Sequence, residues 1–476
     1  MGKPFYLTTT LPYVNAEPHI GFALELVHAD IIARTRALLG DEVFFNTGTD
    51  EHGIKIFRKA EEEGKDTQVY VDEYAAKFRE LKTILALSDE LHFIRTTDEH
   101  HKKAAQEMWR RCAMKGDIYK KKYKGLYCAG DEMFLKESDL VDGKCPNHPT
   151  MEPLEIEEEN YFFRLSSYQE KLLAYLRSET ILPAWRREEA IKFVEQGLED
   201  FSISREKKRM SWGVPVPDDD EQVMYVWFDA LTNYVSTLGW PEDTEGLFKK
   251  FWEEGETVQL AGKDQVRFQS VMWQAMLMSA GLRTTKRVVY HGFITSGGQK
   301  MSKSLGNVID PLSLVREYGT DAVRYFLARH IHPFEDSDFT TDRFKDAYNA
   351  DLANGLGNLV ARVMRLAEAH LDAPASIAFV PYPSEFTDAI ARHDIAAAAG
   401  YIGERIQALD QKINKTEPFK LVKTDAEKGK ALIEELVREL AAIDLMLEPI
   451  VPETSKKIIE AIMANKKPDN LFPRKD

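Results

Sequence analysis

Two short segments carry side chains suited to binding a phosphate chain. The first reads HIGF over residues 19–22 and stands between a predicted strand and a predicted helix. The free N–H groups and positive dipole end of a helix N-terminus attract phosphate, and Gly21 lets a ligand approach the backbone closely. The imidazole of His19 can donate to a phosphate oxygen, although a histidine at this place can equally be a helix cap or a surface residue.

The second segment, GGQKMSKS over residues 297–304, places Lys300 and Lys303 in a glycine-started loop directly after a predicted strand. A mobile loop of this kind can close over a triphosphate and stabilise the charge that develops on departing pyrophosphate. A solvated basic surface loop has the same composition. The chain contains neither G-x-x-x-x-G-K-[ST] nor G-x-G-x-x-G, so the P-loop and dinucleotide-binding motifs lack their residues.

Both segments need secondary structure to position them. The hydrophobic pattern predicts a strand over residues 5–10, a helix that ends at Gly40 and a strand over residues 43–47. Strand, helix and strand in immediate succession form a βαβ unit, which implies a parallel sheet. The same alternation returns with a predicted helix over residues 273–280 and a predicted strand over residues 288–294.

Two further regions have a different character. Residues 112–215 contain Cys128, Cys145, an acidic run over residues 155–159 and short turns, and we interpret them as an insertion that splits one nucleotide-binding fold. Beyond about residue 345 the pattern changes to long helices that would form a bundle. These helices are predicted over residues 350–368, 389–414 and 428–444. The predicted fold class is therefore α/β, a split Rossmann-type parallel sheet with an inserted connective domain, followed by a C-terminal all-α helical bundle.

The composition limits the class of protein. A chain of 476 residues with 43% hydrophobic residues, 25 Phe and 18 Tyr is not disordered, and its length suggests about three domains. Three cysteines cannot build a disulfide framework and fit a reducing, cytoplasmic compartment. We expect no membrane partner, because no apolar run is long enough to span a bilayer and the N-terminus lacks a signal-peptide layout.

The net charge of −15 argues against wholesale coating of nucleic acid. It does not exclude a local basic surface, since lysine and arginine are concentrated over residues 101–124 and nearly balance the acids over residues 345–476. Each of these stretches can also be an ordinary solvated helix face.

Together, the two phosphate-binding segments resemble the paired HIGH and KMSKS signatures of class I aminoacyl-tRNA synthetases. The sequence around them is similar, block by block and in the same order, to the methionyl-tRNA synthetase family within that class. The blocks are LPYVNAEPHIGF (11–22), NTGTDEHG (46–53), FIRTT (93–97), EEENYFFRLS (157–166), SISR (202–205), YVWFDALTNY (225–234), AGKD (261–264), NADLANGLGNLVAR (349–362) and TEPF (416–419). The resemblance covers nearly the whole chain.

The resemblance implies ATP-dependent ligation of methionine to its tRNA, tRNA(Met), in two steps. The methionine carboxylate would attack the α-phosphate of ATP, giving methionyl-adenylate and pyrophosphate. The terminal ribose hydroxyl of the tRNA would then accept the methionyl group, with release of AMP. By family position Asp50 would hold the methionine ammonium, and aromatic edges would contact the thioether sulfur favourably. The other methionine-pocket positions are Leu11, Tyr13, Trp227, Ala230, Tyr234 and Gln269.

Other functional positions follow from the same resemblance. ATP, whose phosphates normally arrive with Mg²⁺, would be bound by His19, Gly21, Asp264, Lys300 and Lys303, and of these His19 and the two lysines would assist catalysis. The implied domains are the two Rossmann halves 1–111 and 216–310, the connective domain 112–215, a stem-contact linker 311–344 and an anticodon-binding bundle 345–476.

The helical bundle contains positions that match the anticodon-reading residues of the family. Asn358 and Arg362 are one helical turn apart and share a face. Phe419 takes the place of the usual tryptophan, where an aromatic ring can stack on an unpaired base. Without the resemblance, ordinary packing after Pro418 would explain Phe419 equally well.

The sequence departs from the family pattern in three places. Phe22 stands at the fourth position of HIGH and cannot donate to phosphate, so His19 and the loop lysines must suffice or a neighbour must compensate. Gln269 replaces a frequent histidine, and its amide still offers a donor and an acceptor. In the insertion, the spacing of a zinc knuckle survives, but a carboxylate is unusual in structural zinc sites, so bound Zn²⁺ and a metal-free knuckle both stay open. The four knuckle positions are Cys128, Asp131, Cys145 and His148.

Two alternative functions compete with this interpretation. A synthetase for leucine, isoleucine or valine would carry a large editing insertion, and the insertion here is too short for one. A cysteine enzyme would place zinc at its amino-acid site, but no cysteine lies in the first Rossmann blocks. A non-catalytic RNA-binding paralogue is opposed by the intact Asp50, Lys300 and Lys303 and kept open by Phe22. Because the chain ends at Asp476, soon after the bundle, we expect a monomer.

Overall fold

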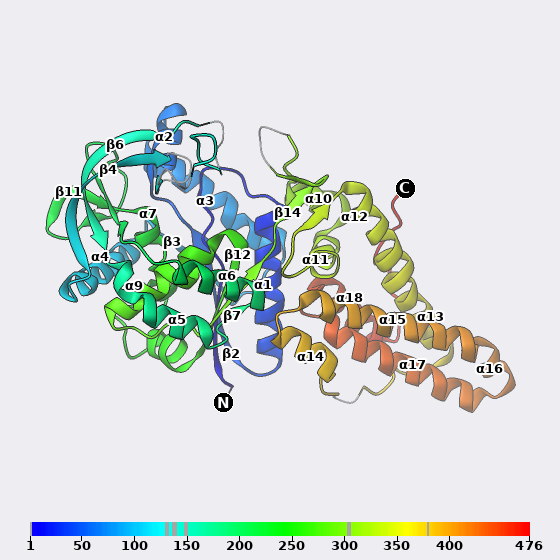
Figure 1. Cartoon of the computed structure of the whole chain (residues 1–476). Coiled ribbons are helices and arrows are strands. Elements are labelled where there is room, and N and C mark those ends of the chain that lie inside the picture. Colours follow the sequence, from blue (N-terminus) through cyan, green and yellow to red (C-terminus); the bar gives the residue numbers. More distant parts are fainter. Residues whose placement is uncertain (1, 129–132, 136–139, 147–150, 302–305, 378–379) are drawn as a thin grey trace. The chain divides into compact units, whose positions relative to one another are not determined.

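A computed structural model describes residues 2–128, 133–135, 140–146, 151–301, 306–377 and 380–476 (Figure 1). The chain divides into two units, each assembled from segments that are distant in sequence. The first comprises Met1–Pro18, Gly40–Glu80 and Asp89–Tyr290, and the second comprises His19–Leu39, Leu81–Ser88 and His291–Asp476. The predicted α/β class is confirmed, because a parallel sheet organises the first unit and helices dominate the second.

The first unit is built on a six-stranded sheet with the order β3-β2-β1-β12-β13-β7. Its strands are β1 (Pro4–Thr8), β2 (Glu42–Thr49), β3 (Leu91–Arg95), β7 (Ile181–Leu182), β12 (Glu256–Gly262) and β13 (Arg287–His291). Strand β1 pairs in parallel with both β2 and β12, β2 pairs in parallel with β3, and β13 with β7. Since the chain order reverses at β1, the β1–β12 boundary is the topological switch point at which open α/β sheets bind ligands.

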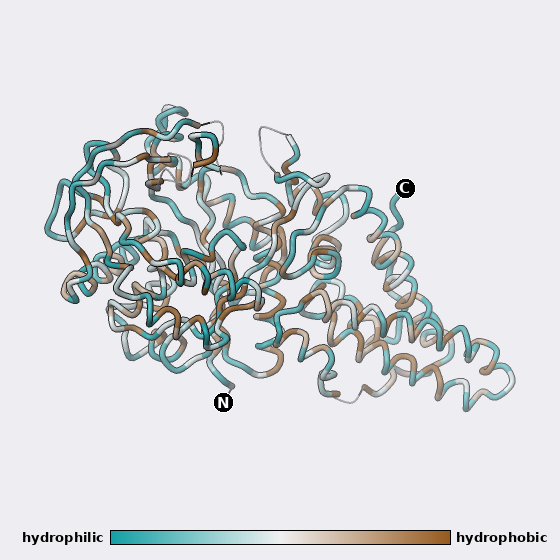
Figure 2. Tube along the Cα trace, viewed as in Figure 1, coloured by the Kyte–Doolittle hydropathy of each residue, from teal (hydrophilic) through white to brown (hydrophobic). Residues whose placement is uncertain are grey.

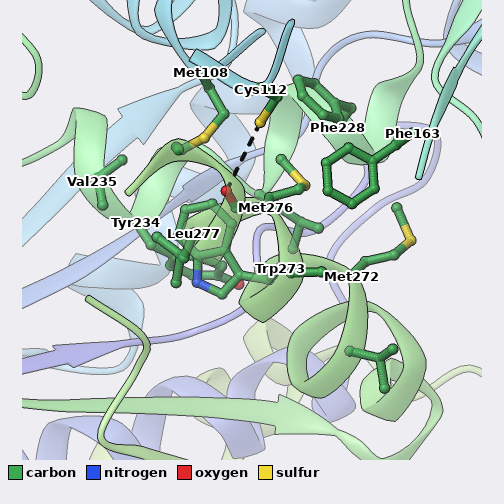
Figure 3. Packing of buried hydrophobic residues seen from close by; sticks show 14 of the residues in the cluster. Met108, Cys112, Phe163, Phe228, Tyr234, Val235, Met272, Trp273, Met276 and Leu277 are labelled. Atoms are coloured by element: carbon green, nitrogen blue, oxygen red, sulfur yellow. Dashed lines mark hydrogen bonds between the residues drawn. The ribbon is translucent and has the colours of Figure 1, made fainter. Parts of the chain in front are cut away.

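Aromatic and sulfur-containing side chains fill the core of this unit (Figure 3). The ring of Tyr6, in the middle of β1, is fully buried and its hydroxyl donates to the carbonyl of Tyr234 at 2.8 Å. Cys112, on α4 (Glu99–Met114), faces α9 (Trp273–Ala280), where its thiol approaches the carbonyl of Met276 at 3.9 Å. Burial raises the pKa of this thiol to about 12, so Cys112 acts as a small core residue and not as a nucleophile.

The region between the sheet halves contains a four-stranded antiparallel sheet with the order β5-β4-β6-β8. Its strands are β4 (Ile118–Cys128), β5 (Met133–Leu135), β6 (Leu154–Phe163) and β8 (Phe201–Ser202). The basic run of β4 lies in register with the acidic run of β6, so that Lys122 opposes Glu159 and Lys124 opposes Glu157. Opposite charges across a strand pair stabilise it, which explains why the two charge runs occur in this region.

Between β6 and β8 of this sheet the chain returns to the parallel sheet. Strand β7 lies within residues 112–215 and pairs with β13. The remaining elements of the first unit are α2 (Ile54–Glu62), η2 (Leu165–Tyr168), α5 (Gln169–Arg177), α6 (Ala184–Glu195), β9 (Ser204–Glu206), β10 (Pro215–Val216), β11 (Asp219–Met224), α7 (Val226–Ala230), α8 (Asn233–Ser236), η3 (Phe248–Glu254), η4 (Lys263–Gln265) and η5 (Phe268–Met272). Helix α3 (Thr67–Ile84) begins in the first unit and ends in the second.

In the second unit, α13 (Asn358–His370), α15 (Ile395–Thr416) and α17 (Ala426–Leu447) lie side by side in the C-terminal bundle. Hydrophobic and hydrophilic stretches alternate along their traces (Figures 1 and 2). Apolar side chains at helical spacing, such as Ile402, Ile406 and Leu409, are buried between them. The elements are α1 (Ile20–Leu38), β14 (Ile294–Ser296), β15 (Gln299–Lys300), α10 (Pro311–Tyr318), α11 (Thr320–Arg329), β16 (Ser337–Phe339), α12 (Thr341–Ala347), η7 (Tyr348–Gly357), α13 (Asn358–His370), α14 (Ser384–Ala391), α15 (Ile395–Thr416), α16 (Pro418–Thr424), α17 (Ala426–Leu447) and α18 (Pro452–Ala464). Among the described residues, no helix is long and apolar enough to cross a membrane.

One predicted helix is wrong. The sequence predicts a single helix over residues 389–414, whereas α14 ends at Ala391 and α15 begins at Ile395. Between them His393 has a positive φ of 59°, and the carboxylate of Asp394 caps α15 by accepting from the N–H of Ala397 at 3.0 Å. The alanine-rich pattern continues across the break and hid this cap.

Asp444 on α17 gives the bundle a pH-dependent stability. Burial raises the pKa of its carboxyl to about 7, a hydrogen bond with Ser455 opposes the rise, and Glu448 adds to it. The folded state therefore keeps a proton that the unfolded chain loses near pH 4, and stability falls as the pH rises from about 4 to 7. We expect Asp444→Asn, which keeps the shape and removes the charge, to raise the melting temperature clearly at pH 8 and less at pH 5.

Circular dichroism melts at the two pH values provide the measurement. Asp388→Asn, which neutralises an exposed carboxylate on α14, is the control and should change the melting temperature little at either pH. Equal shifts for Asp444→Asn at pH 5 and pH 8 would contradict the assigned titration.

Candidate functional site

Three parallel strands lead directly into residues predicted to bind substrate. The carboxyl end of β1 leads to Leu11 and Tyr13, that of β2 to Asp50 and that of β12 to Asp264. Carboxyl ends of parallel strands share one edge of the sheet, and this edge at the switch point is where ligands bind in such folds. The sheet topology therefore gathers residues that are far apart in sequence.

Backbone hydrogen bonds join the segments after β1 and β2. Tyr13 and Asp50 form an isolated parallel bridge. The N–H of Asp50 donates to the carbonyl of Pro12 at 2.9 Å, and the N–H of Val14 donates to the carbonyl of Asp50 at 3.2 Å. The position of Asp50 relative to Tyr13 is thus set by the main chain.

Glu51, the neighbour of Asp50, fixes the same loop through its buried carboxylate. Its carboxylate is fully buried and accepts two hydrogen bonds from the guanidinium of Arg95, at 2.7 and 2.8 Å. The hydroxyls of Thr49 and Thr97 each donate to it at 2.5 Å. Because all these bonds act on the residue beside Asp50, the loop has little freedom to move.

Helices α7 and α8 and the turn η5 supply an aromatic wall in the first unit. The ring of Trp227 stacks on that of Phe268, with centroids 3.9 Å apart and planes 14° from parallel. The side-chain amide of Gln269 is buried and donates to the hydroxyl of Tyr234. Its Oε1 is buried with no hydrogen-bond partner among the described residues, so it can accept a hydrogen bond from a ligand. Three of the predicted pocket residues, Trp227, Tyr234 and Gln269, therefore take part in two contacts that are joined by the neighbours Phe268 and Gln269. Ala230 lies on α7, the same helix as Trp227.

A buried charge cluster next to this wall was not singled out from the sequence. The carboxylate of Asp229 is completely buried and accepts from His52 Nδ1 at 2.6 Å and from His101 Nε2 at 2.8 Å. Burial alone would raise the pKa of Asp229, but the two imidazoles lower it to about 2. Asp229 is therefore an anion at neutral pH. The only sequence signal was that His52 and Asp229 fall within two of the similar blocks.

His19 and Gly21 lie at the start of α1, in the second unit. His19 caps the helix, with its Nδ1 accepting from the N–H of Gly21 at 3.0 Å, and its ring packs on that of Phe22 at 4.4 Å. A Cβ on residue 21 would come within 2.8 Å of His19 Cε1, so any other residue there would displace the ring from its present position. Burial lowers the pKa of His19 to about 4, so the imidazole is neutral at pH 7 and carries its proton on Nε2.

Lys300 lies in the second unit on a tight hairpin. Gly297 and Gly298 have φ angles of 62° and 75° and connect β14 to β15 as a two-residue turn. The N–H of Gly298 donates to Asp338 Oδ1 at 2.7 Å. Lys300 is exposed, and its Nζ lies 5.9 Å from the centre of the Phe293 ring. Lys303 lies outside the described residues, so its predicted role has no structural test.

A fully buried arginine holds α1 in place. Arg324 on α11 forms an ion pair with Asp30 of α1 at 2.8 Å, and both side chains have zero exposure. The same guanidinium donates to the carbonyls of Leu85, Pro449 and Ile450 at 2.8 to 3.0 Å. One side chain thus connects α1, the segment that follows α3 and the turn between α17 and α18.

The predicted anticodon residues lie on the surface of the bundle. Asn358 is exposed on α13, and 44% of Phe419 is exposed at the start of α16, which contacts α13. Arg362 on α13 donates to Asp410 and, at 2.6 Å, to Asn414, both on α15. Phe419 is thus not a core residue, so ordinary core packing does not account for it.

The predicted zinc knuckle is only partly described. Cys128 and Cys145 are buried and pack with Leu135 and Leu140 in a small apolar cluster. Asp131 and His148 lie outside the described residues. Among the residues that the structure does describe, no group of three His, Cys, Asp or Glu could hold a metal ion. Because two of the four knuckle positions are not described, zinc binding stays a prediction from the sequence.

Comparisons with known proteins agree with one another. The family model for class I tRNA synthetases (M) matches residues 5–152 and 150–364. The methionine–tRNA ligase of Thermotoga maritima is 40% identical to the chain, over 98% of the chain and 76% of its own length. That of Rhizobium meliloti is also 40% identical, over 97% of the chain and 92% of its own length. The chain is also similar to the solved structure of Mycobacterium tuberculosis methionyl-tRNA synthetase in complex with methionyl-adenylate, with a TM-score of 0.88 and 35% sequence identity. The match covers 100% of the present chain and 99% of the solved chain.

Breaking the Arg324–Asp30 pair should be strongly destabilising. Removing one partner leaves an uncompensated buried charge, which typically costs about 3–5 kcal/mol. We expect Asp30→Asn to reduce the free energy of unfolding by about that amount, as measured by urea denaturation.

The exposed pair Lys59–Glu62 on α2 provides the control, because Glu62→Gln should cost no more than about 1 kcal/mol. A comparable small loss in Asp30→Asn would show that the buried pair does not hold the second unit together.

Proposed function

Because the chain belongs to the methionine–tRNA ligase family of class I tRNA synthetases, we propose that its substrates are methionine, ATP with its Mg²⁺, and tRNA(Met). The reaction is the ATP-dependent ligation of methionine to tRNA through methionyl-adenylate, with release of pyrophosphate and AMP. The observation that carries this conclusion is the likeness, along the whole chain, to a solved synthetase that binds methionyl-adenylate.

In the first unit, methionine would bind beside the sheet edge after β1 and β2. The carboxylate of Asp50 would pair with the methionine ammonium. Leu11, Tyr13, Trp227, Ala230 and Tyr234 would surround the thioether, for which aromatic edges are favourable neighbours. The buried Oε1 of Gln269 offers an acceptor in the same pocket.

ATP would be bound by residues with donors for its phosphates. A neutral His19 whose Nδ1 is used in capping leaves Nε2–H free to donate to a phosphate oxygen. Gly21 and the first N–H groups of α1 favour the same anion, Asp264 follows β12, and Lys300 and Lys303 would neutralise charge on departing pyrophosphate. Phe22 donates nothing, but its ring supports that of His19, so we propose that one imidazole is enough.

The bundle would read the anticodon of the tRNA. Asn358 and Arg362 offer groups for base edges, and the exposed ring of Phe419 offers a stacking surface. In this scheme residues 112–215 and 311–344 keep their proposed connective and stem-contact roles. All three cysteines are described and buried, and no disulfide joins them, which is compatible with the reducing cytoplasm that we propose.

Exchange of pyrophosphate into ATP, assayed with each of the twenty amino acids, tests the proposed function. We expect exchange that depends on methionine and on Mg²⁺ and needs no tRNA. Preferential exchange with another amino acid would favour a different synthetase, and exchange with none would favour the non-catalytic paralogue.

Lys303→Ala should slow methionyl-adenylate formation about 10²-fold or more, the scale of losing one transition-state donor. Single-turnover formation of adenylate is the measurement. Lys466→Ala, which removes an exposed lysine beyond α18, is the matched control and should behave as wild type. An unchanged rate in Lys303→Ala would rule out the assigned role.

Asn358→Ala and Phe419→Ala should leave tRNA-independent methionine activation unchanged. Losing a base-edge or stacking contact typically costs about 1–3 kcal/mol, so charging of tRNA(Met) should fall roughly tenfold or more. The loss should be smaller for a tRNA with a mismatched anticodon, where the contact is already absent.

Trp185→Ala is the matched control for Phe419→Ala, because Trp185 is an aromatic of similar exposure, 47%, on α6 of the first unit. It should charge tRNA normally. Equal damage to activation and charging in the bundle variants would indicate that Asn358 and Phe419 only support the fold.

A further inference from the structure

The buried cluster around Asp229 lies among residues of the proposed methionine pocket. Asp229 is adjacent to Ala230 and two residues after Trp227 on α7. His52, which donates to its carboxylate, is two residues after Asp50. The His52–Asp229 hydrogen bond of 2.6 Å therefore joins the loop that carries the ammonium-binding carboxylate to the helix that carries the aromatic wall.

His101 completes the cluster from a third element. Its Nε2 donates to the other carboxylate oxygen of Asp229 at 2.8 Å, and its Nδ1 lies 2.9 Å from the hydroxyl of Ser236 on α8. Because a carboxylate only accepts, His52 must carry a proton on Nδ1 and His101 a proton on Nε2. The contact between His101 Nδ1 and the hydroxyl of Ser236 joins the same imidazole to α8, and either atom can be its donor.

Stability alone does not account for a charged cluster at this place. The surrounding core is apolar and aromatic, with Trp109, Phe163 and Phe228 buried in it. Replacing a buried ionic cluster by well-packed apolar groups is often neutral or stabilising. What directional hydrogen bonds add over apolar packing is a defined orientation between the elements that they connect.

We propose that Asp229, His52 and His101 are positioning residues that set the spacing between Asp50 and the wall formed by Trp227 and Ala230, and thereby the affinity for methionine. The three side chains act through the pocket residues and do not themselves contact the substrate. This inference rests on the proposed function and deepens it. It assigns to the cluster a selective effect on methionine, with no corresponding effect on ATP.

The geometry of the two imidazoles allows a matched set of variants. The amide nitrogen of asparagine lies as many bonds from the backbone as histidine Nδ1, and that of glutamine as many as Nε2. His52→Asn and His101→Gln should therefore retain the bonds to Asp229, whereas His52→Gln and His101→Asn should lose them. His52→Leu removes the donor altogether.

The experiment measures KM for methionine and for ATP by pyrophosphate exchange in the full chain. We expect His52→Leu, His52→Gln and His101→Asn to raise KM for methionine about ten- to hundredfold, the scale seen when supporting residues of a site are lost. KM for ATP should stay within about twofold of wild type. His52→Asn and His101→Gln should bind methionine nearly as wild type.

Tyr168→Phe controls for a purely structural effect. It deletes a buried hydrogen bond to Asp117 in the same unit, and neither residue belongs to the proposed pocket. It should lower the melting temperature and leave both KM values unchanged. If His52→Leu does not fold, the comparison of His52→Asn with His52→Gln carries the test.

Two results would overturn the inference while leaving the proposed function intact. One is a KM for methionine that stays at the wild-type value in His52→Gln and His101→Asn. The other is an equal rise in the KM values for methionine and ATP. A wild-type protein that shows no methionine-dependent exchange would instead overturn the proposed function, and this inference with it.

Discussion

The second unit depends on the buried ion pair between Arg324 and Asp30. A guanidinium with zero exposure is tolerated only when its donors are satisfied, and Arg324 bonds one carboxylate and three carbonyls from three separate chain segments. A lysine, with one compact ammonium, could not reach all of them. The geometry of the planar guanidinium therefore determines where α1 lies within the unit, and with it the helix start that carries His19 and Gly21.

In the first unit, buried anions play the part that the buried guanidinium plays in the second. Glu51 and Asp229 are each fully buried, each accepts hydrogen bonds from several donors, and each is next to a proposed pocket residue in sequence. The positions of Asp50 and Ala230, both proposed pocket residues, are thus constrained by buried neighbours. In both units the residues proposed to bind ligands stand beside charged residues that the protein keeps from water.

Local sequence patterns predict most of the helices and strands, but they do not predict contacts between segments that are far apart in the sequence. The strand–helix–strand start and the helical bundle are periodic in sequence and were found. The pairing of β7 with β13 and the Asp229 cluster each join residues that are distant in sequence and whose spacing carries no signal. The cap that His19 forms on α1 is local and is one of the alternatives that the sequence offers. The break at Asp394 was missed for a different reason, since the alanines on both sides of the cap continue the helical pattern.

The short strand β7 has a consequence for how freely the inserted region could be exchanged. Its two residues, Ile181 and Leu182, form the outer edge of the parallel sheet next to β13, although they lie inside the stretch that separates the two sheet halves. Excising that stretch as one cassette would leave β13 with unpaired backbone groups and a bare edge prone to pairing with other chains. Part of the insertion therefore belongs to the parallel sheet that it interrupts. Only the antiparallel sheet formed by β4, β5, β6 and β8 could be exchanged as a separate module.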